Sequence, residues 1–569
     1  MKTDPRENFM TDVYAQKPWL KTFPDWLPYS LGSPDRTILD DFEQSLQTHP
    51  DAPCIHYFDA SYSYKATAEM AYALASALDR IGLGRGDRVV VVMQNIPQVI
   101  ITSLAVWMRA AVVVPVNPMY TAEEQNHLIC DSGARLVICQ DDLFAPLQEY
   151  TGKNENLLAV ITTSPLDLLP SQQDFPPQMQ PLSRHACPGG LDLMSLIRDG
   201  AATDVEIIRP EVQDLAYLVY TSGTTGPPKG AMLTHHNIGH NTRVYRCAVQ
   251  LDRSDVVLGV APLFHITGIV AHLAIAFHVG IPLVLFHRFD VIDVLELIEK
   301  YRITFTVAAI TVYSALLNHP ETQKYDITSL KKAYSGGAPV SPSIVENLKQ
   351  TLGLTIYNAY GLTESASPAT ITPLGQCGPV DPESGALSVG LIVPGLEAWI
   401  VNVEDPDDIL PLGQAGELVL RGPCMVDGYW EKPEETAHAI KDGRFFTGDV
   451  AKIDDQGWCY IVDRKKDLIN VSGYKVWPRD VEDVLYQHPA VKEAAVIGIP
   501  DEYRGETVMA FVAVTDDCKG KVTPEELISF CKAKMAAFKY PRKLEIIDEI
   551  PKTPTGKFLR RQLRVPSAQ

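Results

Sequence analysis

An alternation of short valine-rich runs with longer amphipathic runs constrains the fold of this chain more than any other feature. Residues 88–93 (RVVVVM) and 111–116 (AVVVPV) have the length and β-branched composition of buried strands, and residues 97–109 between them have helical spacing. Neighbouring parallel strands need such a helical crossover. The pattern therefore predicts a parallel sheet covered by helices, and a second alternation over residues 256–359 predicts a second sheet.

The remaining segments predict smaller units beside the two sheets. Residues 386–421 contain short alternating strands with Gly and Pro turns, which indicate a β subdomain. With 569 residues, the chain is also too long for one core. We predict an α/β fold with a large N-terminal domain of two stacked mixed or parallel sheets with helices (1–465), which includes a small β-barrel-like subdomain (about 385–460), and a small α+β C-terminal domain (466–569).

Three local patterns give further expectations. Residues 56–64 predict an exposed hairpin, and residues 151–205, which include SQQDFPPQMQP, predict a loop-rich surface region. The apolar run 269–286 is interrupted by His272, His278 and a Gly-Ile-Pro turn. It therefore predicts a core helix, a turn and a strand rather than a membrane span.

Charge and cysteine usage limit the classes of partner. The formal net charge of -20 disfavours a nucleic-acid-binding protein, because such proteins need a basic surface. The ten cysteines are scattered, without a Cys-x-x-Cys pair or Cys/His ligand spacing, which predicts reduced thiols, a cytoplasmic location and no zinc site. The first residues, MKTDPRENFMTDVYAQ, lack the apolar core of a signal peptide. A peripheral association with the inner membrane stays open.

The stretch 217–234, YLVYTSGTTGPPKGAMLT, predicts a phosphate-binding loop directly after a buried strand. Its glycines allow close backbone approach, its hydroxyl groups can donate to phosphate oxygens, and Lys229 supplies a cation. The spacing departs from that of a Walker A loop, because Pro228 rather than a glycine precedes the lysine. The alternative is an ordinary surface loop rich in Gly and Thr.

The segment NAYGLTES (358–365) supplies groups that a nucleotide site needs. Tyr360 can stack on a purine, Thr363 can donate to an α-phosphate, and Glu364 can hold Mg²⁺. The alternative is a strand-to-helix turn in which the threonine caps the helix.

Four further segments suit the same chemistry. SGGA (335–338) would let a flat ring lie against the backbone, although a plain tight turn has the same composition, and Asp449 in TGD could accept from both ribose hydroxyls. DRKKDLINVSGYKVWP (463–478) predicts a junction, from which Arg464 could reach a ribose or phosphate. The end of the chain, 532–564, has ten Lys and Arg against three acids, which suits either a polyanion or a solvated basic face.

Taken together, TSGTTGPPKG, YGLTES, TGD, DRKKDLINVSGYKV and PTGK resemble the motifs of the adenylate-forming superfamily in order and rough spacing. That superfamily includes acyl-CoA synthetases, peptide-synthetase adenylation domains and firefly luciferase. The resemblance covers nearly the whole chain. It is closest to the bacterial long-chain fatty-acid-CoA ligases, through KPWLKTFPDWLP, GDRVVVVMQNIPQ, VVPVNPMYTAEE, PLFHITG and PKTPTGKFLRRQLR.

The resemblance implies a two-step reaction with ATP, Mg²⁺ and coenzyme A. A carboxylic acid first becomes acyl-AMP, and a thiol then displaces AMP. The residues implied for ATP and its pyrophosphate are Thr221, Ser222, Gly223, Thr224, Thr225 and Lys229; for adenine Gly336, Gly337, Ala338, Tyr360 and Gly361; for the α-phosphate Thr363; for Mg²⁺ Glu364; and for the ribose Asp449 and Arg464.

The resemblance also implies roles near the C-terminus and in the acyl pocket. Lys557 matches the catalytic lysine of adenylation, which a mobile C-terminal domain carries, and Lys466 matches the hinge. Gly473, in Ser-Gly-Tyr, matches the loop that lines the pantetheine tunnel. The implied acyl pocket includes His265, Ala308 and Ala338, although a lone histidine is also a common core residue.

The leading hypothesis is an ATP-dependent, AMP-forming ligase that joins a medium- or long-chain fatty acid to CoA. Aryl or polycyclic acids, and loading of a carrier protein instead of CoA, are the alternatives within the same chemistry. Amino acids are disfavoured, because PLFHITG lacks the aspartate that would pair with a substrate ammonium. A catalytically silent nucleotide-binding scaffold is a third alternative, and a homodimer stays open.

Overall fold

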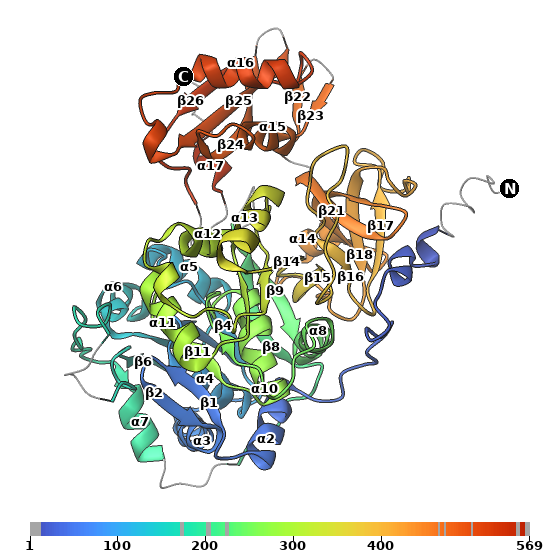
Figure 1. Cartoon of the computed structure of the whole chain (residues 1–569). Coiled ribbons are helices and arrows are strands. Elements are labelled where there is room, and N and C mark those ends of the chain that lie inside the picture. The colour runs from blue at the N-terminus through green and yellow to red at the C-terminus, as the bar shows by residue number, and fades with distance from the viewer. Residues whose placement is uncertain are drawn as a thin grey trace, which may run out of the picture.

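The computed structural model describes residues 13–170, 176–200, 206–221, 227–464, 467–471, 474–501, 504–552 and 558–563. It contains three sheets, two in the large N-terminal part and one in a smaller unit at the C-terminal end (Figure 1). Helices accompany every sheet. The predicted α/β fold class is therefore confirmed.

The first sheet has seven strands in the order β7-β6-β5-β3-β4-β8-β9 and is parallel except for its last pair. The two valine-rich runs form its centre as β3 (Arg88–Val92) and β4 (Val112–Pro115). Helix α4 (Pro97–Trp107) between them is buried along its whole length, as expected of a crossover in a core. The other elements are β5 (Leu136–Gln140), β6 (Ala159–Thr163), β7 (Leu191–Asp192), β8 (Leu215–Thr221), β9 (Lys229–Thr234), α3 (Tyr64–Ile81), α5 (Ala122–Asp131), α6 (Asp141–Thr151) and α7 (Leu193–Gly200).

The second sheet has 14 strands, and its parallel part forms the second predicted sheet. Across this part the order is β14 (Ile356–Leu362), β13 (Lys332–Ser335), β12 (Phe305–Ala308), β10 (Val257–Leu258), β11 (Leu283–Leu285) and β1 (Pro53–Tyr57), with β2 (Ala60–Ser63) antiparallel at the edge. The helices of this part are α2 (Ile38–Thr48), α8 (His235–Ala248), α11 (Val291–Tyr301), α12 (Ile310–Asn318) and α13 (Pro342–Leu352).

Beyond β14 the same sheet continues with antiparallel strands, which form the predicted β subdomain. These strands are β15 (Ser367–Ile371), β16 (Gly390–Ile392), β21 (Trp458–Arg464), β20 (Arg444–Ile453), β18 (Gly416–Arg421) and β17 (Glu397–Val401). The β14–β15 hairpin therefore joins the subdomain to the parallel strands without a break in the sheet.

An N-terminal strap, residues 13–37, runs from the β subdomain to the core (Figure 1). Trp19 is buried so tightly against Gly457 that a Cβ added to the glycine would lie 2.1 Å from the tryptophan Cα. Farther along, Arg243 of α8 donates to the carbonyls of Leu31 and Gly32 at 3.0 and 2.8 Å. The strap thus fixes the subdomain relative to the helix that follows the phosphate hairpin.

The C-terminal unit has its own five-stranded sheet and its own buried apolar cluster, which includes Val481, Val496, Val512 and Leu527. Its strands are β22 (Ile469–Val471), β23 (Tyr474–Val476), β24 (Val491–Asp501), β25 (Gly505–Val514) and β26 (Lys543–Ile546), and its helices are α15 (Pro478–Tyr486), α16 (Pro524–Lys534) and α17 (Arg560–Leu563). The predicted boundary at residues 465 and 466 lies outside the described residues.

Three local expectations need comment. The prediction that the hairpin at residues 56–64 is exposed is wrong. Ile55 and Tyr57 of β1 are fully buried, and β1 pairs with β11 inside the sheet. Residues 151–205 supply β6, β7 and α7, but most of the described residues in this range lie outside helices and strands, so the prediction of a loop-rich region is confirmed. NAYGLTES leads into strand β15 rather than a helix, so the alternative of a helix cap at Thr363 is also wrong.

The apolar run 269–286 forms the predicted core helix, turn and strand. Helix α9 (Ile266–Gly268) continues as a π-helical turn, η3 (Ile269–Ala274), then as α10 (Ile275–Val279), and β11 follows. Gly280 at φ 77° ends this helix. Among the described helices, none combines the length and the apolar composition that a membrane crossing requires.

Candidate active site

Three predicted contact residues lie at the carboxyl ends of neighbouring parallel strands. Strand β12 ends at Ala308, β13 ends one residue before Gly336, and β14 contains Tyr360. The amide of Gly336 donates to the carbonyl of Ala308 at 3.2 Å, and Ser335 lies opposite Asn358 in the β13–β14 register. Ligands of open α/β sheets bind outside this edge, so the predicted adenine and acyl residues share a suitable location.

The SGGA segment forms a turn at this edge. Gly337 has φ +81°, a conformation that favours glycine, and it is exposed. A Cβ on Gly336 would lie 3.1 Å from the carbonyl oxygen of Ala359, so the two strand ends approach closely only because no side chain stands between them. Ala338 follows and is half-buried. The segment is therefore a tight turn whose glycines leave its backbone uncovered by side chains.

Tyr360 and Asp449 are in direct contact. The phenol of Tyr360 donates to Asp449 Oδ2 at 2.6 Å. Burial, and then the neighbouring carboxylate, raise the pKa of Tyr360 far above its usual value, so the phenol stays a donor. Asp449 of β20 lies opposite Arg464 of β21, which is described by its backbone alone. The residues predicted for purine and ribose thus come together although 89 positions separate them.

The turn at residues 361–367 is strained and crowded. Ala366 and Ser367 have φ values of 49° and 85°, which non-glycine residues rarely adopt. A Cβ on Gly361 would lie 1.5 Å from the carbonyl oxygen of Ser367, so this position admits only glycine. The register of the β14–β15 hairpin shifts at the same place, between Tyr360 and Gly361. Such strain persists only where the surroundings fix the backbone.

Helix α8 supplies the groups that fix this turn. The buried Asn241 amide donates to the carbonyls of Ser365, Ala366 and Pro368 at 2.7, 2.8 and 3.0 Å. One helical turn earlier, Asn237 donates to the carbonyls of Pro423 and Met425 at 3.0 and 2.9 Å. Two asparagines thus hold two loops of the site against the helix that follows the phosphate hairpin.

We did not predict these asparagines. Asparagine is uncommon in helices. The signal in HNIGHN that could have indicated a role beyond helix formation is therefore the pair Asn237 and Asn241, four residues apart. Asn95 was missed as well. Its side chain donates to the carbonyls of Gly259 and Ala261 at 2.8 and 3.0 Å and accepts from the amide of Leu263 at 2.8 Å, which joins the two sheets beside the PLFHITG segment.

Glu364 and Lys229 share one neighbour, Tyr429. The phenol of Tyr429 donates to Glu364 Oε1 at 2.8 Å, and the Lys229 ammonium lies 5.4 Å from the centre of the same ring. The backbone of Glu364 is fixed too, since its carbonyl accepts from the amide of Val426 at 2.9 Å. Thr363, half-buried beside it, accepts from the amide of Ala366 at 3.0 Å through its carbonyl.

The phosphate loop connects two antiparallel strands, β8 and β9. This geometry differs from the strand-to-helix loop of a Walker A motif, which agrees with the sequence prediction. Thr221 at the end of β8 donates to the carbonyl of Lys229 through Oγ1 at 3.5 Å. Ser222, Gly223, Thr224 and Thr225 lie outside the described residues.

The predicted acyl-pocket residues lie on three segments, and Ala338 belongs to the SGGA turn after β13. His265 is half-buried, and its Nδ1 accepts from the amide of Thr267 at 3.3 Å, which caps helix α9. Ala308 is buried at the end of β12. Beside it, His272 of the π-helical turn accepts from the amide of Val307 at 3.3 Å, and burial lowers its pKa to about 3, so its imidazole is neutral.

All three residues predicted for the C-terminal unit, Lys466, Gly473 and Lys557, lie outside the described residues. Their neighbours are paired. Arg560 donates to both Glu482 oxygens at 2.7 and 2.8 Å and lies 3.5 Å from Asp467, and Lys552 pairs with Glu493 at 2.6 Å. Acidic partners therefore offset part of the basic excess at the end of the chain.

Glu364 fits the role of a Mg²⁺ ligand. It is a half-buried carboxylate that accepts from Tyr429 at Oε1, and the two oxygens of a carboxylate can accept a hydrogen bond and contact a cation at the same time. Within the part of the chain that the structure describes, no group of three or more His, Cys, Asp or Glu side chains could hold a metal alone. Mg²⁺ is commonly bound by one or two carboxylates together with substrate phosphates, so a single carboxylate beside a phosphate loop suits it.

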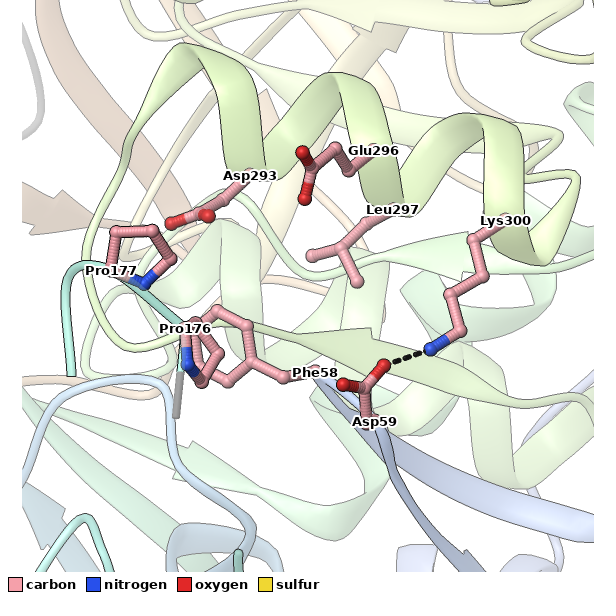
Figure 2. A pocket seen from close by; sticks show the side chains of 8 residues that line it. All are labelled: Phe58, Asp59, Pro176, Pro177, Asp293, Glu296, Leu297 and Lys300. Atoms are coloured by element: carbon pink, nitrogen blue, oxygen red, sulfur yellow. Dashed lines mark hydrogen bonds and ion pairs between the residues drawn. The ribbon is translucent and has the colours of Figure 1, made fainter. Parts of the chain in front are cut away.

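A separate cleft lies at the β1–β2 end of the second sheet, away from β12–β14 (Figure 2). One face of α11, with Asp293, Glu296 and Lys300, lines it opposite Phe58 and Asp59. Lys300 pairs with Asp59, and Asp293 accepts from the side chain of Gln178. Its volume is about 130 Å³. The cleft holds none of the predicted site residues.

Comparisons with known proteins identify the family of the chain. The family model described as AMP-binding enzyme matches residues 42–430, and the model of the AMP-binding enzyme C-terminal domain matches residues 480–557. A long-chain-fatty-acid–CoA ligase of Bacillus subtilis is 35% identical over 566 residues, which cover 97% of this chain and 98% of that protein.

Two solved structures have the same fold. ATP-bound MatB from Rhodopseudomonas palustris has a TM-score of 0.80 and 27% identity, and the match covers 92% of this chain and 98% of that one. The anthranilate CoA ligase AuaEII in complex with anthranoyl-AMP has a TM-score of 0.81 and 25% identity, covering 94% and 97%. Because the AMP-binding model alone spans more than half of the sequence, the chain belongs to the AMP-binding enzyme family, as its motifs predicted.

Proposed function

We propose that this AMP-forming acyl-CoA ligase acts on a medium- or long-chain fatty acid. Support comes from the Bacillus subtilis relative, which is named a long-chain-fatty-acid–CoA ligase and matches this chain over nearly its full length. The elements of the predicted acyl pocket are also uncharged, with buried Val307 and Ala308 beside the neutral His272. No carboxylate lies in residues 261–268 to pair with the ammonium of an amino acid.

The observation that carries the activation of a carboxylic acid is the convergence of four groups from distant parts of the chain. Tyr360 contacts Asp449, while Glu364, four residues after Tyr360, shares Tyr429 with Lys229. An aromatic ring, a ribose-accepting carboxylate, a metal-binding carboxylate and a phosphate-binding cation are the groups that a nucleoside triphosphate needs.

In the first half-reaction, an oxygen of the fatty-acid carboxylate attacks the α-phosphorus of ATP. The bond from that phosphorus to the bridging oxygen of the β-phosphate breaks, and pyrophosphate leaves. In our proposal, Lys229 and the loop from Thr221 hold the leaving pyrophosphate, while Thr363 donates to the α-phosphate. Bound Mg²⁺ supplies charge neutralisation between the two anions, and Glu364 would hold it.

In the second half-reaction, the sulfur of CoA attacks the acyl carbon. The bond to the AMP oxygen breaks, AMP leaves, and the thiol proton passes to solvent. We assign the adenylation lysine, Lys557, to a separate C-terminal domain of residues 466–569 that turns about Lys466. The rotation would withdraw the lysine and present Gly473 and its loop to the pantetheine chain.

The test is a panel of carboxylic acids of increasing chain length with ATP, Mg²⁺ and CoA. Pyrophosphate release and the mass of the acyl-CoA product are the measurements. We expect both signals to be largest with acids of medium to long chain length. Larger signals with an aryl acid would favour the alternative to which the anthranilate-activating neighbour points. Acyl-AMP that persists with CoA but is consumed by a carrier protein would overturn CoA as the acceptor.

A further inference from the structure

Tyr429 stands between the two charged groups of the proposed phosphate and metal site. Its hydroxyl donates to Glu364 Oε1 at 2.8 Å, and its ring centre lies 5.4 Å from the Lys229 ammonium. Only 8% of the residue is exposed. It follows β18 and precedes α14 (Pro433–Ala439), so it reaches the site from the β subdomain side.

The segment around Tyr429 is anchored on both sides, so the ring has a fixed position. The amide of Trp430 donates to the carbonyl of Gly230 at 2.8 Å, and the amide of Met232 donates to the carbonyl of Gly428 at 3.2 Å. These bonds attach the segment to β9, directly after Lys229. On the other side, the amide of Tyr429 itself donates to Thr436 Oγ1 at 3.0 Å.

We propose that Tyr429 is a positioning residue that aims the Glu364 carboxylate at Mg²⁺ and holds Lys229 toward the phosphates. The proposal rests on the proposed roles of Glu364 and Lys229. A carboxylate can accept about four hydrogen bonds or metal contacts, so a bond from a fixed phenol can orient it and is compatible with a cation on the same group.

The chemistry of the phenol suits this position. Burial and then the Glu364 carboxylate raise the pKa of Tyr429 well above its usual value, so its hydroxyl remains a donor throughout the working pH range. The aromatic face attracts the Lys229 ammonium without neutralising it. A carboxylate in the same place would hold the lysine equally well but would cancel the charge that the phosphates need.

The two contacts can be separated by substitution. Tyr429→Phe removes the hydroxyl and keeps the ring, so it should act through Glu364 and Mg²⁺ alone. We expect the affinity for ATP in the presence of Mg²⁺ to fall about tenfold, which corresponds to about 1.4 kcal/mol. The affinity for ATP in EDTA should be unchanged. Calorimetric titration of the full-length protein, with no carboxylic acid or CoA present, measures both values.

This titration is independent of the acyl specificity. If the fatty-acid proposal fails, no fatty acid of the panel gives the largest acyl-CoA signal, yet the Mg²⁺-dependent loss in Tyr429→Phe remains. If the positioning proposal fails, Tyr429→Phe binds ATP with Mg²⁺ as tightly as the unmodified protein, whatever the panel shows.

Tyr460→Phe is the matched control. Its phenol is buried and donates to Asp454 Oδ2 at 2.9 Å within the β subdomain, so the same chemical change is made away from the phosphates. We expect normal ATP affinity with Mg²⁺ in this variant. An equal loss in both variants would mean that a general weakening of the subdomain causes the effect, and this would overturn the proposal.

A double-mutant cycle tests whether Tyr429 acts through Glu364. In the Glu364→Gln background, Tyr429→Phe should cause no further loss of Mg²⁺-dependent affinity. A full tenfold loss in that background would contradict the proposed route. Tyr429→Leu, which also removes the ring, should weaken ATP binding in EDTA by about threefold, the effect of losing a modest cation–π contact at Lys229. Unchanged binding in EDTA would overturn the part of the proposal that concerns Lys229.

Discussion

The turn at residues 361–367 and the C-terminal unit both serve the proposed reaction, but the protein holds them in different ways. The turn is fixed by buried polar groups, with Asn241 bound to three of its carbonyls and Glu364 bound by Tyr429. The C-terminal unit has its own apolar core and meets β21 through Arg479, which donates to the carbonyl of Ile461 at 2.7 Å and to Asp463 through its amide at 3.0 Å.

This difference suggests that the turn positions groups of the proposed site, whereas the C-terminal unit moves. Backbone strain at Ala366 and Ser367 persists only in rigid surroundings, so we expect the groups proposed to hold ATP to keep one arrangement. Relative motion is the default expectation for domains joined by a small polar interface, so we expect the C-terminal unit to be able to change its orientation. The comparison supports our proposal that the N-terminal part supplies most of the adenylation site and that Lys557 completes it from a C-terminal unit that can move.

The largest expected effect comes from Lys557→Ala. If the C-terminal unit supplies only this lysine to adenylation, pyrophosphate release should fall roughly a hundred- to a thousand-fold, as for loss of one strong electrostatic contact to a transition state. Formation of acyl-CoA from preformed acyl-AMP should be spared. Rapid-quench measurement of each half-reaction checks both points.

Lys543→Ala is the control for the lysine substitution, because Lys543 is exposed on β26 of the same unit. It should leave both half-reactions unchanged. Equal losses of the two half-reactions in Lys557→Ala would contradict the division of labour between the two regions.

The sequence predicted the elements that depend on local pattern. The valine-rich strands β3 and β4, the helix α4 between them and the β subdomain all have a periodicity or turn composition that is visible in a short window. The strand-to-strand phosphate loop was also predicted to differ from a Walker A loop, because the spacing around Lys229 is wrong for one.

The errors and omissions share a physical cause, which is that they depend on contacts between distant segments. Strand β1 was expected to be exposed, but pairing with β11, more than 200 positions away, buries it. Tyr429 has no local signal in the sequence and Asn241 has only its spacing to Asn237. Their contacts form only when α8 and the segment before α14 pack against the turn between β14 and β15. The predicted roles of Lys557, Lys466 and Gly473 stay predictions, since these residues lie outside the described ranges.

The next largest effect concerns the rigid side of the comparison. Asn241→Leu leaves three carbonyls of the turn without their donor, and the free energy of unfolding should fall by about 2–4 kcal/mol. Adenylation should fall with it, because the strained turn would relax. Urea unfolding measures the change in the free energy of unfolding. Pyrophosphate release, at a temperature at which the variant is folded, measures the change in adenylation.

Asn347→Leu provides the comparison for this substitution, since Asn347 is exposed on α13 and accepts only from Thr351 Oγ1. It should change the free energy of unfolding by less than about 0.5 kcal/mol. If Asn241→Leu behaved in the same way, the turn would not depend on α8, and the contrast between the regions would be lost.

A smaller effect is expected on the movable side. Arg560→Gln leaves the Glu482 carboxylate, whose side chain is 6% exposed, without its cation, and this should destabilise the C-terminal unit by about 2 kcal/mol. Hydrogen exchange should increase in peptides from residues 478–552 and remain unchanged in peptides from residues 356–371. The double variant with Glu482→Gln should recover most of the loss, because neither charge then remains buried alone.

Exchange that rose equally in both sets of peptides would contradict the comparison. It would mean that the two regions unfold as one cooperative unit, despite the separate apolar core of the C-terminal sheet.

The smallest effect uses pH to distinguish the regions. Burial lowers the pKa of His272 to about 3, so its contribution to stability is complete above the unfolded value of about 6.5 and is lost as the pH falls below it. Burial raises the pKa of Asp483 in the C-terminal unit to about 6, so ionisation weakens that unit as the pH rises through 6, and acid strengthens it. Between pH 7.5 and 5.5 the two regions should therefore respond in opposite directions.

His272→Gln isolates the N-terminal response, because a glutamine oxygen can accept from the Val307 amide as the imidazole does and does not titrate. When the pH is lowered from 7.5 to 5.5, the free energy of unfolding should fall in both proteins, but by about 1 kcal/mol less in this variant than in the unmodified protein. Urea unfolding at the two pH values measures the difference. Equal losses would show that the folded protein accommodates a charged His272, and the buried neutral histidine would then no longer distinguish the rigid region from the movable one.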